Sequence, residues 1–291
     1  MFMINLAVDI GGTYIKYALI DDRYTIIRKW KVPTLKFDDK DRFYDYLCQN
    51  MKDIDNISRI GVSAPGLIDS ESYVKSIAAP NVKIMFETSI RAEIERRVAK
   101  PTTAINDAKA AGVCEFRLGN AQGTKSAAFI IIGTGTGGCL CDENGVINGA
   151  DSFAGEFHFI PYWDNKSQQL LKLGNHSSIR GLQNAYQRLS GSDALNSERI
   201  IEASRKGDPL AQQAVDEWLH HVALMTLNVL CFYDPEVICF GGAISKADWF
   251  IDTVRDKVSS MTESHVKSQV FTTRLLACKY HNDANLIGSL L

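Results

Sequence analysis

The sequence has no excess of basic residues and no long apolar run. Its 32 Lys and Arg are balanced by 34 Asp and Glu, which gives a formal net charge of −2. Proteins that bind DNA, RNA or anionic membrane surfaces carry basic patches that neutralise phosphates. A membrane-spanning helix needs about 18 consecutive apolar residues, and no run approaches that length. We therefore expect neither nucleic acid nor a membrane as a partner.

Paired cysteine motifs and targeting signals are missing as well. The seven cysteines are an odd number without a CxxC spacing, and no HExxH or Cys/His zinc spacing occurs. The opening residues, MFMINLAVDIGG, contain no basic region, no long apolar stretch and no small-residue cleavage site. These features predict reduced, mostly buried thiols in a cytoplasmic protein and no zinc site.

The length of 291 residues suits two domains, and 45% apolar and 23% charged residues are typical of a globular chain. Short apolar runs alternate with helical periodicity, which predicts an α/β fold. The opening resembles a β-meander. Strands are expected at 4–9, 17–20, 25–32, 59–63, 103–105, 127–132, 139–141 and 237–240. Helices are expected at 43–51, 90–98, 208–234, 249–258 and 283–291.

Two glycine-rich turns each follow a predicted strand. The first is Gly11-Gly12-Thr13 after Asp9, and the second is the segment 133–138, GTGTGG. Glycines let the backbone approach an anion closely, and a strand-end carboxylate such as Asp9 can hold hydrated Mg²⁺. The spacing matches neither a P-loop nor a dinucleotide fingerprint. An ordinary hairpin turn is the alternative, but two such turns favour phosphate binding and a weak internal duplication with one hairpin per domain.

Three further positions are candidates for chemistry, each with a structural alternative. Asp107 follows a short strand and could accept a hydroxyl proton during phosphoryl transfer. Helix capping would explain one residue of the pair Asn106-Asp107 equally well. Glu156 could bind the hydroxyls of a polyol, or it could be a surface residue. Gly242 ends a buried strand where a nucleotide could lie against backbone, although a simple turn would look the same.

Together these segments resemble the ROK family of sugar kinases, within the actin–Hsp70–hexokinase superfamily. The resemblance covers almost the whole chain in the family's order. It rests on DIGGTYIK (9–16), SAPGLID (63–69), INDAKAAGVCEF (105–116), IGTGTGG (132–138), AGEFHF (154–159), FGGAIS (240–245) and NDANLIGSLL (282–291).

The resemblance implies two ribonuclease-H-like α/β domains, 1–107 plus 282–291 and 108–281, with ATP and sugar in a cleft between them. It implies that Asp107 is the catalytic base and that a homodimer is plausible. Mg²⁺ would be held by Asp9 through water. The sugar would contact Gly66, Asn106, Asp107, Glu156 and Phe159. ATP would contact Asp9, Gly11, Gly12, Thr13, Lys16, Gly133, Thr134, Gly135, Gly241 and Gly242.

Two departures from the family pattern concern zinc. The His expected three residues after Glu156 is Phe159, with His158 beside it. The segment 174–187, GNHSSIRGLQNAYQ, has no cysteine where the family's zinc-binding cysteines would lie. The sequence is therefore similar to the zinc-free branch, in which a Ser-led helix replaces the metal site, as in bacterial β-glucoside kinases. The family's second sugar-binding Glu has only Gln183 as a candidate counterpart.

The expected function is an ATP- and Mg²⁺-dependent sugar kinase acting on a hydroxyl, with the 6-OH of a β-glucoside as the expected acceptor. N-acetylmannosamine kinase and glucokinase are the near alternatives. A sugar-responsive ROK transcriptional regulator is disfavoured, because the first strand begins by Ile4 and leaves no room for a helix-turn-helix.

Overall fold

The computed structural model describes residues 3–78, 80–165, 167–191, 195–262 and 271–291. The chain forms two compact units. Unit 1 comprises Met1–Arg117, Val146–Ala154 and Asn282–Leu291, and unit 2 comprises Leu118–Gly145 and Gly155–His281. The expected domain ranges stay a prediction. Within the described ranges, no helix combines the length and the apolar content needed to cross a bilayer.

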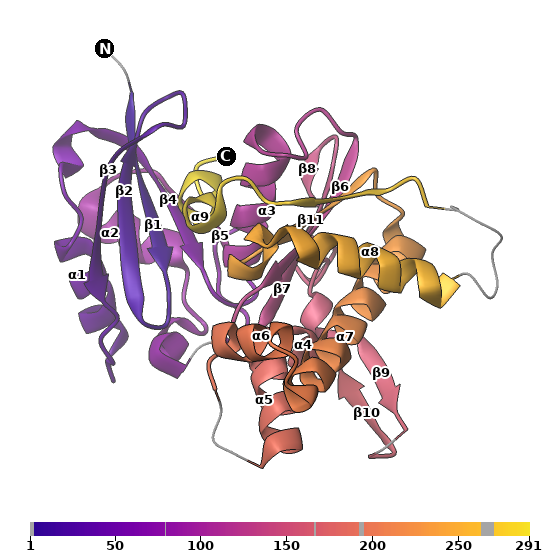
Figure 1. Ribbon diagram of the computed structural model, residues 1–291. Helices are drawn as coiled ribbons and strands as arrows, with labels where there is room; N and C mark the ends of the chain where they lie inside the picture. Colours follow the sequence, from indigo (N-terminus) through magenta and orange to yellow (C-terminus); the bar gives the residue numbers. More distant parts are fainter. Residues whose placement is uncertain (1–2, 79, 166, 192–194, 263–270) are drawn as a thin grey trace. The chain divides into compact units, whose positions relative to one another are not determined.

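Unit 1 is built on one five-stranded sheet with the order β3-β2-β1-β4-β5. The first three strands form the predicted antiparallel meander, and the last two run parallel to β1 (Figure 1). The strands are β1 (Ile4–Ile10), β2 (Tyr14–Ile20), β3 (Ile26–Pro33), β4 (Ile57–Ala64) and β5 (Thr102–Asn106). The helices are α1 (Lys40–Gln49), α2 (Ile90–Val98), α3 (Asp107–Leu118) and α9 (Ala284–Gly288).

The C-terminal helix α9, yellow in Figure 1, packs on β1 and β4 from the opposite end of the chain. Glycines allow this close approach. A Cβ at Gly288 would overlap the carbonyl oxygen of Ala110 in α3, and one at Gly61 would overlap that of Ser289. Residues 107–117 of α3 belong to unit 1, as α9 does.

Unit 2 repeats the plan, with the sheet order β12-β11-β6-β7-β8. Here β6 and β7 form the antiparallel hairpin, and β11 and β12 lie parallel to β6. Read from the other edge, this order matches unit 1, so the predicted duplication is confirmed in the sheet topology. The strands are β6 (Ser126–Ile132), β7 (Thr136–Asp142), β8 (Gly145–Val146), β11 (Val237–Gly241) and β12 (Arg274–Ala277).

The remaining elements of unit 2 lie outside its five-stranded sheet. A separate hairpin of β9 (Pro161–Asp164) and β10 (Gln169–Lys172) was not predicted, because its strands are short and largely exposed. The long helix α7 begins where expected, since Asp208 accepts the Ala211 N–H. The helices are α4 (Gly174–Ser177), α5 (Ile179–Ser190), α6 (Ser197–Arg205), α7 (Pro209–Tyr233) and α8 (Asp248–Thr262).

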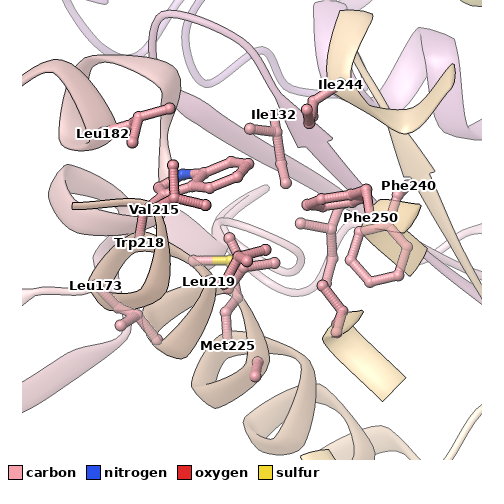
Figure 2. Packing of buried hydrophobic residues seen from close by; sticks show 14 of the residues in the cluster. Ile132, Leu173, Leu182, Val215, Trp218, Leu219, Met225, Phe240, Ile244 and Phe250 are labelled. Atoms are coloured by element: carbon pink, nitrogen blue, oxygen red, sulfur yellow. The ribbon is translucent and has the colours of Figure 1, made fainter. Parts of the chain in front are cut away.

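Trp218 of α7 lies in the middle of the unit 2 core (Figure 2). Its ring is 1% exposed and stacks on Phe250 of α8, with ring centroids 5.7 Å apart. Its indole N–H donates to the carbonyl oxygen of Ser177 at 3.0 Å, so the one polar atom of the ring is satisfied. The core therefore fixes α4 and the chain entering α5 against α7.

Candidate active site

The carboxyl ends of the three parallel strands of unit 1 bring its candidate residues to one edge of the sheet. Asp9 pairs in register with Ser63 of β4, and Ala64 pairs with Asn106 of β5. Ligands of open α/β sheets bind outside the carboxyl ends of the strands. The edge that carries Asp9, Asn106 and Asp107 is therefore where a ligand of unit 1 is expected.

Asp9 is a buried carboxylate, 4% exposed, held by three donors. Its Oδ1 accepts from Ser63 Oγ at 3.0 Å and from Asn285 Nδ2 at 3.3 Å, and its Oδ2 accepts from Lys16 Nζ at 2.9 Å. A buried charge requires such partners. Ser63 and Asn285 were absent from the predicted site, although both lie inside motifs that carry the family resemblance.

The first glycine turn has its carbonyl groups fixed by the surrounding protein. The carbonyls of Gly11, Gly12 and Thr13 accept, respectively, from Thr34 Oγ1 at 2.6 Å, Asn81 Nδ2 at 2.8 Å and Thr34 N at 2.9 Å. In a trans peptide the N–H points opposite to the C=O. The Gly12 N–H is thus directed away from Thr34, and the Thr13 N–H is directed away from Asn81.

The start of α3 assigns different roles to Asn106 and Asp107. Asn106 Oδ1 accepts the Lys109 N–H at 3.1 Å, which caps the helix, while Asn106 Nδ2 donates to the Gly66 carbonyl at 3.0 Å. Gly66 can present this carbonyl because its φ of +102° suits glycine. Asp107 Oδ1 accepts the Ala108 N–H at 2.8 Å. Capping thus accounts for Asn106, and Asp107 follows it as the first residue of α3.

Backbone hydrogen bonds hold the second glycine turn, between β6 and β7. The Gly133 N–H donates to the Gly135 carbonyl at 2.9 Å, and the Gly133 carbonyl accepts the Ile179 N–H at 2.9 Å. The Thr134 N–H therefore points away from Ile179. A Cβ at Gly135 would meet no atom within 4 Å, so this side of the turn is open.

A hydroxyl pair ties the same turn to α4. Thr136 Oγ1 and Ser177 Oγ lie 3.0 Å apart, both fully or nearly buried, and Ser177 is in turn held by Trp218. The next residue, Ser178, accepts the Gly181 N–H and so caps α5, which is the expected Ser-led helix. No signal in the sequence singled out Ser177.

Gly242 follows β11 beside the end of β6. Gly241 pairs in register with Ile131 of the parallel strand β6. Gly242 has a φ of +96°, and a Cβ there would overlap the carbonyl oxygen of Ile132. The backbone after β11 thus lies directly against the residue that precedes the second glycine turn, where only glycine fits.

Glu156 precedes a single turn of 3-10 helix, Phe157–Phe159, whose last residue is Phe159, and Glu156 is half-buried. Phe159 is 42% exposed, with Lys172 Nζ 4.6 Å from its ring centroid, so it is not a core residue. His158 is half-buried, and burial together with Lys172 lowers its pKa. Gln183 donates from Nε2 to the Leu195 carbonyl at 3.3 Å.

The predicted site residues fall into two sets. Unit 1 holds Asp9, Gly11, Gly12, Thr13, Lys16, Gly66, Asn106 and Asp107, and unit 2 holds Gly133, Thr134, Gly135, Glu156, Phe159, Gly241 and Gly242. In the part of the chain that the structure describes, no three His, Cys, Asp or Glu side chains are grouped so as to hold a metal ion.

Comparison with known proteins places the chain in a family. The sequence is 24% identical to the β-glucoside kinase of Klebsiella pneumoniae, over 98% of this chain and 94% of that protein. It is 25% identical to the N-acetyl-D-glucosamine kinase of Photobacterium profundum, over 95% of this chain and 94% of that protein.

Solved structures share the fold. A ROK family protein from Streptococcus pneumoniae in complex with sucrose has a TM-score of 0.87 at 26% identity, covering 99% of this chain and 96% of that one. A ROK glucokinase from Streptomyces griseus in complex with glucose and AMPPNP has a TM-score of 0.77 at 24% identity, covering 98% and 97%. The ROK family profile matches residues 5–291, so the chain belongs to the ROK family.

Proposed function

We propose that this ROK protein is an ATP-dependent kinase that transfers the γ-phosphoryl group of ATP to a sugar hydroxyl. The observation that carries the proposal is the arrangement at the start of α3. Asn106 caps the helix and is anchored on Gly66, while Asp107 stands beside it at the carboxyl end of β5. Relatives that match over nearly the whole chain are named sugar kinases.

In this proposal Asp107 accepts the proton of the attacking hydroxyl. The hydroxyl oxygen forms a bond to the γ-phosphorus, the bond to the β-phosphate oxygen breaks, and ADP leaves. Phosphoryl transfer is catalysed chiefly by positioning and by charge stabilisation. The hydrogen bond from the Ala108 N–H holds the Asp107 carboxylate in one orientation, which is what a positioned base needs.

The two glycine turns are proposed to bind phosphate oxygens through their N–H groups. The anchored carbonyls of Gly11 and Gly12 in the first turn, and of Gly133 in the second, support this orientation. Gly242, pressed against Ile132, is proposed to let the adenosine lie against backbone.

Asp9 suits a magnesium ion held through water. An ionised carboxylate has roughly four acceptor positions, and Ser63, Asn285 and Lys16 donate to Asp9. One remaining position fits a water molecule of hydrated Mg²⁺, an ion that keeps several of its waters in proteins. The bound ion would neutralise charge that develops on the phosphates during transfer.

Release of ADP, measured with ATP, Mg²⁺ and a panel of hexoses, N-acetylhexosamines and β-glucosides, tests this proposal. We expect sugar-dependent ADP release that is lost in Asp107→Asn. A panel that gives no release above the background without sugar would refute the kinase assignment for these sugar classes.

A finer assignment, to β-glucosides phosphorylated on the 6-OH, rests on Phe159. A phenyl ring cannot hydrogen-bond a free hydroxyl but can lie against an apolar sugar face or a substituent. Loss of a polar partner weakens selection for a free hydroxyl on the substrate. The 42% exposure of Phe159 supports a contact role over core packing.

The values of kcat/KM for cellobiose, glucose, N-acetylmannosamine and N-acetylglucosamine, measured on one preparation, test the finer assignment. We expect cellobiose to be preferred. A clear preference for any of the three monosaccharides would refute the glucoside assignment and leave the kinase assignment standing.

A further inference from the structure

Lys109 is a lysine buried inside unit 1. It lies in the first turn of α3, two residues after Asp107, and is 1% exposed. An ammonium group is costly to bury unless hydrogen bonds compensate for its lost hydration. Its Nζ donates to Asn148 Oδ1 at 3.0 Å and to the Ser152 carbonyl at 2.8 Å.

Both partners belong to the segment Val146–Ala154, which groups with unit 1 although the chain on either side groups with unit 2. The segment folds back on itself, because the Ala154 N–H donates to the Asn148 carbonyl at 3.1 Å. Ser152 is buried, and its φ of +61° lies in the left-handed region that a serine seldom adopts. Such a backbone persists only where its surroundings hold it, and Lys109 binds the carbonyl of that residue.

Lys109 also contacts Asn106, which the family resemblance assigns to the sugar. The backbone N–H of Lys109 is the donor that Asn106 Oδ1 accepts in capping α3. One residue therefore joins the Asn106–Asp107 turn to a segment that runs directly into Gly155 and Glu156 along the chain. None of the sequence patterns above marks Lys109, which stands in the apolar stretch AKAAGV.

We propose that Lys109 is a positioning residue for the sugar. Its ammonium group fixes the segment 148–154 onto the first turn of α3, whose backbone Asn106 caps, and so anchors the end of the segment that continues along the chain to Glu156. The inference rests on the proposed sugar kinase function and goes beyond it by naming a residue that contacts no substrate. Loss of the ammonium group should therefore raise the KM for the sugar and leave the KM for ATP nearly unchanged.

Lys109→Met keeps the aliphatic length and removes the charge and the donors. We expect it to raise the KM for the sugar about tenfold or more and to lower kcat, since small misplacements in a site cost up to about 100-fold. The KM for ATP should stay within about twofold. Amide hydrogen exchange of residues 147–154 should become faster. Lys206→Met, which removes an exposed lysine paired with Glu202, is the matched control.

Asn148 provides a second test at an exposed position, in case Lys109→Met fails to fold. Asn148→Ala removes one acceptor and should raise the sugar KM by about threefold. Asn148→Asp keeps an acceptor and should retain wild-type kinetics. A role confined to stability would not separate these two variants by their sugar KM.

Three results would overturn the inference. The first is a folded Lys109→Met variant with the wild-type kcat and KM for the sugar. The second is an equal rise in the KM for ATP and in the KM for the sugar. The third is amide hydrogen exchange of residues 147–154 that stays as slow as in the wild type. If the wild type phosphorylates no sugar, the proposed function fails by itself. The exchange comparison then still decides whether Lys109 holds the segment.

Discussion

The two glycine turns occupy equivalent places in the two sheets, but their surroundings differ. Each joins an antiparallel pair, β1–β2 in unit 1 and β6–β7 in unit 2, beside a parallel strand. Two residues before the turn, unit 1 has Asp9 paired in register with Ser63, and unit 2 has Ile131 paired with Gly241. The side chain of Ile131 occupies the space that a Cβ at Gly241 would need. The charged pairing of unit 1 is thus replaced by an apolar one in unit 2.

The groups that hold the two turns also differ in charge. Around the turn of unit 1 lie the ion pair Asp9–Lys16 and the side chains of Thr34 and Asn81. The turn of unit 2 rests on backbone and on the neutral hydroxyls of Thr136 and Ser177. Both turns thus join equivalent strands, but the described supports are charged and polar side chains in unit 1 and backbone with neutral hydroxyls in unit 2. On the proposed function, unit 1 supplies the base and the carboxylate for Mg²⁺ beside its phosphate-binding turn, and unit 2 binds the nucleotide through backbone shape alone.

The largest expected effect comes from removing the proposed base. Asp107→Asn should lower kcat by about 10²–10⁴-fold, because positioned general bases contribute on that order. The ATP affinity, measured by calorimetry or by a fluorescent analogue, should change little, since the glycine turns are untouched. A kcat within about threefold of wild type would show that Asp107 is not the base.

Removing the charge of Asp9 tests whether unit 1 handles Mg²⁺. Asp9→Asn keeps the shape but leaves Lys16 without its anionic partner. We expect kcat to fall by roughly 10–100-fold and the Mg²⁺ concentration for half-maximal rate to rise. Ser63→Ala, which removes only one hydrogen bond to Asp9, is the control and should have a milder effect. An unchanged Mg²⁺ dependence would contradict the assignment.

Backbone shape in unit 2 is tested at its glycines. Gly242→Ala should raise the KM for ATP about tenfold and lower the Tm, because its Cβ overlaps Ile132 and its φ is strained for alanine. Gly135→Ala offers the contrast, since its Cβ meets no atom within 4 Å. Gly135→Ala should leave the Tm unchanged and change only the KM for ATP. Equal Tm values for both variants would contradict the shape argument.

Acid should weaken unit 2 through a half-buried histidine, His221. Burial, first, and the neighbouring His176 lower the pKa of His221 from 6.5 to about 4. Its ring packs on Tyr162 and His176, and Nδ1 must donate, because it faces the Glu217 carbonyl at 2.8 Å. The unfolded chain binds the proton more readily than the folded chain does. The contribution of neutral His221 to the free energy of unfolding is therefore complete above pH 6.5 and declines as the pH falls toward 4.

The measurement is the Tm between pH 7 and 5 for the wild type and His221→Phe, which keeps a ring and removes the titration. A loss of roughly 1 kcal/mol corresponds to about 2–4 °C in a domain of this size. The wild-type Tm should fall more steeply than that of the variant. Parallel curves would assign the acid sensitivity to other groups.

The local parts of this comparison could be predicted from the sequence, and the long-range parts could not. A glycine turn after an apolar strand is encoded within a few residues, so both turns and the meander were found. The supports come from far along the chain, such as Asn285 for Asp9 and Ser177 for Thr136. No periodicity links residues that distant. They become visible only when the sheet and its helices bring them together.

Lys109 shows another limit of sequence reasoning. In a helix, a lysine is most often an exposed residue, and nothing local indicates that Lys109 is buried. Its burial follows from the segment 148–152 folding over α3, a contact between residues about forty positions apart. The role proposed for Asp107 remains a prediction that Asp107→Asn tests, and the role of Glu156 stays a prediction.

The smallest expected effect is that of treatment with a zinc chelator. In unit 2, the Thr136–Ser177 pair, the Trp218 N–H and the Ser178 cap hold the chain at 174–181, where the family pattern predicts zinc-binding cysteines and this sequence has none. A structural zinc contributes folding free energy outright, so its removal destabilises a protein that depends on it. We expect chelation, followed by restored Mg²⁺, to leave both activity and Tm unchanged. Ser177→Ala should instead raise the KM for ATP a few-fold, because it loosens the turn at Gly133. A clear drop in Tm on chelation would show that a metal, and not the hydroxyl pair, fastens this turn.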